Sequence, residues 1–121
     1  MASLNIDLGG QKHRRDLGGT WKIMDVQKSS DIIYDLNSKK PFPFESNTVD
    51  NFYSSMCVEH IPISIVPFVL SELYRTLKTN GILRIVVPDI EIAIKWYLEN
   101  PKLLLSKDAP TKPNEYPNTK L

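Results

Sequence analysis

A short apolar segment that runs directly into two glycines constrains this 121-residue chain more than any other feature. Leu4, Ile6 and Leu8 alternate with polar residues, as in a β-strand, and Gly9-Gly10 follows at once. Glycine has no Cβ, so a ligand can approach the main chain, and the next N–H groups can point at it. Asp7 would stand at the carboxyl end of the strand, where parallel α/β sheets bind ligands. A tight turn without a ligand gives the same pattern, so the rest of the chain must decide.

Composition favours one globular domain and excludes several classes of partner. Hydrophobic residues make up 41% and charged residues 24%, and the formal net charge is +1, so no strong field attracts nucleic acid or an anionic membrane. No apolar run approaches the ~20 residues that span a bilayer, and the N-terminus lacks a signal-peptide pattern. A single cysteine, Cys57, allows neither an internal disulfide nor a cysteine zinc cluster. We therefore expect a cytoplasmic protein with no metal site.

Strand and helix patterns alternate along the chain, which predicts a mostly parallel sheet covered by helices. The strand patterns after the first lie at residues 21–26, 31–36, 49–53 and 82–87. A helical pattern from Ser64 is stopped by Asn80-Gly81, and a final helix covers residues 90–98, in which Glu91 and Lys95 are spaced to pair. The run at 82–87 is almost continuously apolar, which is typical of a strand buried on both faces.

Two segments limit this architecture. Only residues 27–30 separate the second strand from the third, although a parallel crossover usually needs about a dozen, so we expect a short or irregular third strand. Residues 102–121 contain three prolines and many polar groups, which predicts an extended or disordered tail after a domain at 1–101.

Polar residues gather where the strands end. Asp25 follows Asp7 by 18 residues, at the end of the second strand, where an acid can accept hydrogen bonds from both hydroxyls of a ribose. The simpler interpretation is a cap of the strand end. Asp35, Ser54 and Ser55 should lie along the same edge of the sheet.

Four stretches within residues 4–98 form an ordered pattern. No single stretch is specific, but together they resemble class I S-adenosylmethionine-dependent methyltransferases, especially the small "type 11-like" group. The stretches are Asp7 to Gly10, the strand with Asp25, Asp35-Leu36 followed by Pro41-Phe42-Pro43-Phe44, and the region from Val49 to Ile61 with Leu73 to Ile85 and Val87-Pro88-Asp89.

The resemblance implies a Rossmann-like sheet of about five strands in the order 3-2-1-4-5, with helices on both faces. It also implies S-adenosylmethionine as cofactor. Asp7, Gly9 and Gly10 would lie near its amino acid part, Asp25 at the ribose, Asp35 and Leu36 near the adenine, and Ser55 and Met56 beside the reactive methyl. Gln11 stands where the family usually has a glycine, and the family's sixth and seventh strands have no counterpart after Pro101.

The expected activity is methyl transfer to a small molecule or sugar, for which the protein mainly aligns two reactants. His60 is the candidate general base, because imidazole titrates near neutrality; alternatively, Glu59 and His60 only cap loops. A non-catalytic binding or scaffold protein with a reduced methyltransferase fold is the alternative. A nicotinamide-dependent oxidoreductase fits less well, since Gly-x-Gly-x-x-Gly is absent. We expect a homodimer, built around the unpaired outer edge of the fifth strand or around the final helix, where Trp96 and Tyr97 add apolar surface.

Overall fold

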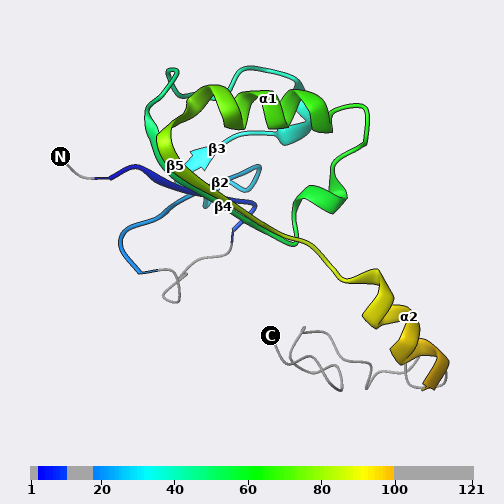
Figure 1. The fold of residues 1–121 in the computed structure, drawn as a ribbon. Coiled ribbons are helices and arrows are strands. Elements are labelled where there is room, and N and C mark those ends of the chain that lie inside the picture. The colour runs from blue at the N-terminus through cyan, green and yellow to red at the C-terminus, as the bar shows by residue number, and fades with distance from the viewer. Residues whose placement is uncertain (1–2, 11–17, 100–121) are drawn as a thin grey trace. The chain divides into compact units, whose positions relative to one another are not determined.

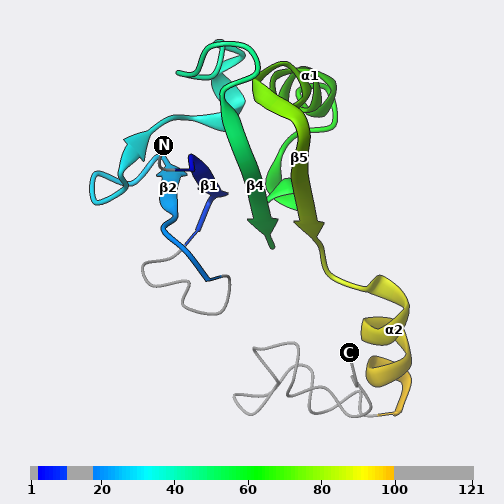
Figure 2. The same cartoon turned by 60° about the vertical axis from the view of Figure 1, so that its left-hand side comes forward.

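Five parallel strands form the sheet of the protein (Figure 1). The computed structural model describes residues 3–10 and 18–99, which fall into two compact units, 1–87 and 88–121. Within the first unit the sheet order is β3-β2-β1-β4-β5 (Figure 2), which confirms the expected Rossmann-like fold and strand order. The strands are β1 (Asn5–Leu8), β2 (Lys22–Asp25), β3 (Ile32–Ile33), β4 (Val49–Ser55) and β5 (Leu77–Val86).

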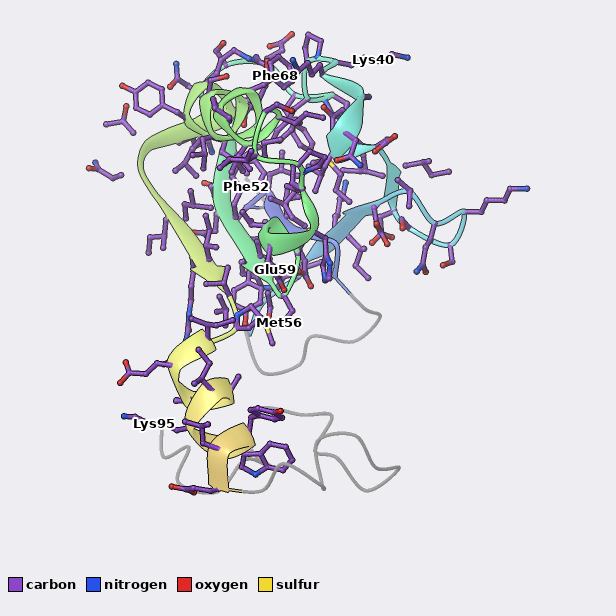
Figure 3. All side chains as sticks on the ribbon, turned by 90° about the vertical axis from the view of Figure 1, so that its right-hand side faces the viewer. Lys40, Phe52, Met56, Glu59, Phe68 and Lys95 are labelled. Carbon is purple, nitrogen blue, oxygen red and sulfur yellow. The ribbon has the colours of Figure 1, made fainter. Side chains whose placement is uncertain are left out.

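The central strand β1 is buried along its whole length. Side chains on one of its faces join those of β2, β4 and helix α1 (Val66–Thr76) in a continuous core. Phe52 of β4 lies in this interior (Figure 3). The opposite face of the sheet carries Asp7 and Tyr53. The core on the α1 side includes Ile6, Leu8, Met24, Phe52, Val69 and Leu73.

The connection between β2 and β3 is a short loop without a helix, as the spacing in the sequence predicts. Strand β3 has only two residues, which pair with Met24 and Asp25. The Asp31 carboxylate accepts the Ile23 amide at 2.8 Å, so a side chain takes the place of a ladder partner before the strand begins. The Tyr34 amide then donates to the Asp25 carbonyl at 3.0 Å. A short third strand without a preceding helix therefore resolves the conflict in the spacing.

Helix α1 ends at Thr76, so the stop predicted at Asn80-Gly81 is wrong. The backbone becomes extended at Leu77, and the amides of Asn47 and Thr48 donate to the last two helical carbonyls at 3.0 and 2.9 Å. Because these loop amides satisfy the helix end, no glycine cap is needed there. Strand β5 therefore starts five residues before the predicted 82–87, and Asn80, with φ 66°, lies inside it.

Strand β5 is not buried on both faces, contrary to the prediction. It is the edge strand among the described residues, and it pairs with β4 alone. Ile82 is 65% exposed, and Leu83 and Ile85 are each 37% exposed. A continuous apolar sequence therefore does not by itself indicate a buried strand, since β5 has no strand on its outer side within the described residues.

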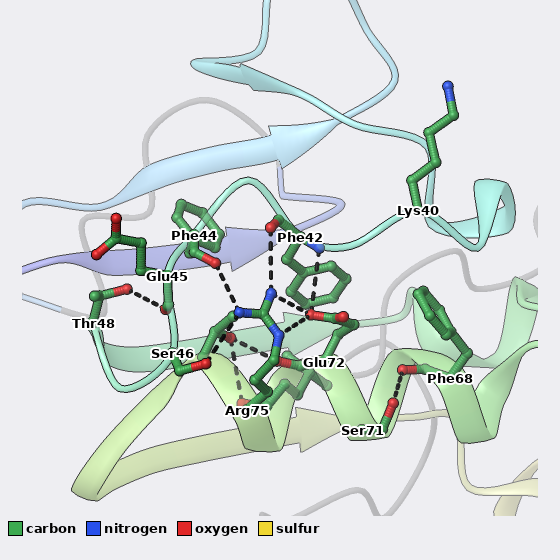
Figure 4. Close-up of polar contacts among 12 residues, drawn as sticks. Lys40, Phe42, Phe44, Glu45, Ser46, Thr48, Phe68, Ser71, Glu72 and Arg75 are labelled. Carbon is green, nitrogen blue, oxygen red and sulfur yellow. Dashed lines mark hydrogen bonds and ion pairs between the residues drawn. The ribbon is translucent and has the colours of Figure 1, made fainter.

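Two paired residues of helix α1, Glu72 and Arg75, form hydrogen bonds with the loop before β4 (Figure 4). The Arg75 Nε donates to Glu72 Oε2 at 2.7 Å, and the guanidinium also reaches the carbonyls of Phe44 at 3.0 Å and Phe42 at 3.4 Å. Glu72 is buried and also accepts the Phe42 amide at 3.4 Å. The Phe42 ring then lies 6.2 Å from that of Phe52. Arg75 and Glu72 therefore hold the main chain of the loop at Phe42 and Phe44 beside the core.

The second unit contains helix α2 (Ile90–Glu99), close to the predicted bounds. Asp89 caps it, since its Oδ1 accepts the amides of Glu91 at 3.0 Å and Ile92 at 3.2 Å. The predicted pair of Glu91 and Lys95 is confirmed at 2.9 Å. The boundary between the two units precedes α2. The domain at 1–101 stays a prediction. The tail at 102–121 lies outside the described residues.

We predict that Arg75→Ala lowers the free energy of unfolding by about 2–3 kcal/mol, because it leaves the Glu72 carboxylate buried without its cation. Arg84→Ala is the matched control: that arginine lies 5.9 Å from the Tyr53 ring, and its loss should cost about 0.5–1 kcal/mol. Urea unfolding followed by circular dichroism measures both. Equal losses would show that the Glu72–Arg75 pair does not hold the loop.

Candidate functional site

A pocket of about 390 Å³ lies at the carboxyl ends of β1 and β2. This volume is in the range of small-molecule sites. Carboxylate, amide and hydroxyl side chains dominate its wall, so the pocket offers mainly hydrogen-bonding groups. The lining residues are Gly9, Gly10, Ile23, Asp25, Gln27, Ser29 and Ser30. The structure therefore brings together three of the predicted cofactor-binding residues, Gly9, Gly10 and Asp25.

The two glycines are required by contacts inside the protein. Gly9 has φ 62°, a left-handed conformation, and its amide donates to the Met24 carbonyl at 2.9 Å. A Cβ on Gly9 would lie 2.7 Å from Cys57 Sγ, and a Cβ on Gly10 would overlap the carboxylate of Asp7. Ligand approach was the predicted reason for Gly-Gly, but packing against these two side chains already demands it. The turn that results still lines the pocket.

Asp7 and Cys57 lie beneath the glycine turn. Asp7 is fully buried, so it supports the turn from within the sheet and is not part of the pocket wall. Burial raises the pKa of the Cys57 thiol; a hydrogen bond with Ser54 opposes this, while the carboxylates of Asp25, Glu59 and Asp7 add to it. A raised pKa keeps the sulfur protonated at neutral pH, so Cys57 is a packing residue rather than a nucleophile.

Asp25 and the loop after it form the most polar wall of the pocket. The Ser30 amide donates to the Gln27 carbonyl at 3.0 Å, and this turn folds the loop back toward β3. Gln27, Ser29 and Ser30 thus come to line the same pocket as Asp25. These three residues were not among the predicted site residues. Their position in the sequence could have identified them, because they form a polar loop directly after Asp25, the candidate ribose-binding acid.

The predicted adenine-side residues serve the local fold. Asp35 is exposed, and its Oδ1 accepts the Asn37 amide at 2.9 Å, which caps the 3-10 turn Leu36–Ser38. Leu36 packs against the hydrophobic core. Neither residue is among those that line the pocket.

The residues predicted beside the methyl group follow the end of β4. Ser55 is the last residue of that strand, and Met56 has φ 55° and donates its amide to the Val86 carbonyl at 2.9 Å. Figure 3 shows Met56 and Glu59 at the end of the sheet opposite to Phe68 and Lys40. Ser55 and Met56 are therefore at the carboxyl edge, as predicted, but outside the lining of the pocket.

His60 belongs to a short 3-10 turn, Val58–His60. Its side chain is 79% exposed, and its Nε2 lies 3.8 Å from Glu59 Oε1. The His60 amide donates to the Cys57 carbonyl at 3.0 Å. The turn thus contains the predicted base, and the imidazole does not line the pocket.

The described ranges, 3–10 and 18–99, contain neither a cluster of metal-ligating side chains nor a membrane-spanning helix. No group of three or more His, Cys, Asp or Glu side chains there is arranged to hold a metal ion. None of the helices in that part has the length and apolar character needed to cross a membrane.

Comparison with known families gives one match. The family model described as a methyltransferase domain matches residues 23–85, just over half of the chain, from β2 through most of β5. No curated protein and no solved structure matches the chain. The matched segment includes Asp25, the loop behind it and the strands on both sides of β1. The chain therefore belongs to the class I methyltransferase domain family that its sequence resembles.

Proposed function

We propose that the pocket at β1 and β2 binds S-adenosylmethionine, and that the chain transfers the methyl group to a small molecule or sugar in the cytoplasm. Members of the matched family generally use this donor. The observation that carries the proposal is the meeting of Asp25 with the Gly9-Gly10 turn in one pocket. The cytoplasmic setting is supported by Cys57, a free thiol in a chain with one cysteine.

The pocket wall suits the ribose of such a donor. The Asp25 carboxylate can accept from two neighbouring hydroxyls, and the hydroxyl groups of Ser29 and Ser30 can donate or accept beside it. Gly9 and Gly10 supply main chain without side chains at the pocket surface. The donor itself supplies a methyl group on a positively charged sulfur, so the protein needs to orient the reactants rather than activate the carbon.

His60 is the proposed base for an acceptor whose hydroxyl or amine must lose a proton. Its high exposure leaves the imidazole accessible to an acceptor arriving from solvent, and the Glu59 carboxylate at 3.8 Å can orient it. An acceptor that needs no deprotonation would make His60 dispensable.

A non-catalytic binding protein is the second candidate function. It is favoured by one specific observation: the residues expected at the methyl group, Ser55 and Met56, and the expected base His60 do not line the pocket with Asp25. If the pocket binds the donor but no site for methyl transfer adjoins it, the protein would act as a sensor or a scaffold.

We predict that Asp25→Asn weakens binding of S-adenosylhomocysteine by 10- to 100-fold, about 1.4–2.7 kcal/mol, because the amide keeps the shape but cannot accept from both hydroxyls. Isothermal titration calorimetry measures the dissociation constants. Glu45→Gln, an exposed carboxylate on the loop before β4, is the matched control and should bind like the wild type. Equal affinity in all three proteins would place the ligand elsewhere.

The two candidate functions differ in turnover. For a methyltransferase, S-adenosylhomocysteine should form from the donor when a panel of sugars and small hydroxylated molecules is added. His60→Gln should then lower kcat by about 10²-fold or more, without changing the dissociation constant of S-adenosylhomocysteine. Donor binding with no product from any acceptor in the panel would support the binding protein, and normal kcat in His60→Gln would remove His60 as the base.

A further inference from the structure

We propose that the outer edge of β5 pairs, antiparallel and about a two-fold axis, with β5 of a second copy of this chain. The two five-stranded sheets would then form one continuous sheet. This assembly is independent of the donor pocket, because β1 and β4 separate β5 from the pocket strand β2.

The main-chain groups of β5 define which residues can pair outward. The Val86 carbonyl accepts the Met56 amide at 2.9 Å, so the polar groups of Val86 point toward β4. Peptide groups alternate between the two sides of a strand, so those of Ile82 and Arg84 point the same way. The amides and carbonyls of Leu83 and Ile85 therefore point to the outer edge, which has no strand neighbour among the described residues.

The side chains of this edge lack the usual protection against pairing. Edge strands commonly carry lysines that keep other strands away. Here Lys78 is held 2.9 Å from Asp50 Oδ1, and the Asp50 carboxylate also accepts the Leu4 amide at 2.7 Å. Arg84 lies over the ring of Tyr53 at 5.9 Å. Both cations of the strand are thus engaged within their own chain. Apart from Arg84, the exposed side chains of its second half are apolar: Ile82, Leu83 and Ile85.

A second copy fits this edge because the strand is complementary to itself. Antiparallel pairing centred on Leu83 sets Leu83 opposite its own counterpart and Ile82 opposite Arg84, so the two guanidinium groups do not face each other. Ile82 is 65% exposed in the single chain and would be covered. The formal net charge of +1 adds little repulsion between copies.

The test is light scattering after size exclusion over about 5–200 µM protein, with three β5 variants and one control. Ile82→Lys should raise the dimer dissociation constant at least tenfold, because it sets a lysine opposite Arg84 of the other copy. Ile82→Glu should keep the dimer, since it offers that arginine a carboxylate. Ile85→Pro removes an outward amide and should also give monomers. Ile63→Lys, at an apolar position 89% exposed outside β5, should stay dimeric.

Circular dichroism and a thermal melt establish that each variant is folded. As an independent measurement on the wild type, amide exchange at Leu83 and Ile85 should slow as concentration rises, while exchange at Ile82 and Arg84 should stay constant. A wild-type monomer throughout the range would overturn the proposal. So would a dimer that is weakened equally by Ile82→Lys and Ile82→Glu, because that result indicates a nonspecific apolar contact rather than the register described.

Discussion

The left-handed backbone at Gly9 is the constraint on which the site depends. It ends β1 with φ 62° while its amide donates to Met24 of β2, so the turn is tied to both strands that border the pocket. Cys57 occupies the space that a Cβ on residue 9 would need, and the Asp7 carboxylate occupies the space that a Cβ on residue 10 would need. Side chains from β1 and from the segment after β4 therefore fix the shape of the turn, and Asp25 stands across from it because β1 and β2 are in register.

A second constraint acts at the other side of the core. The Glu72–Arg75 pair holds the loop of Phe42 and Phe44 over Phe52, which closes the hydrophobic interior beside β1. The amides of Asn47 and Thr48 donate hydrogen bonds to the last carbonyls of α1. The same loop therefore determines where the helix ends and β5 begins. The core that supports the pocket strands therefore depends on hydrogen bonds between segments about 30 residues apart.

The family resemblance supplied the strand order that the structure has. Local pattern was sufficient for most strands and for placing Gly9, Gly10 and Asp25 at strand ends, because strand periodicity and strand ends are local properties. It failed where distant partners decide the outcome. Asn80-Gly81 has the composition of a helix stop, but amides from another loop end α1 earlier. The apolar run at 82–87 reads as a buried strand, yet exposure depends on neighbours that a local pattern does not contain. The roles of Ser29 and Ser30 required the fold of the β2–β3 loop.

The central claim is that the glycine turn and Asp25 form a donor-binding pocket. A titration of ¹⁵N-labelled protein with S-adenosylhomocysteine, followed by amide chemical shifts, tests it most directly. The account predicts saturable shifts at the amides of Gly9, Gly10, Asp25 and Ser30, with little change in α1. Shifts centred on another part of the sheet, or none at millimolar ligand, would contradict it.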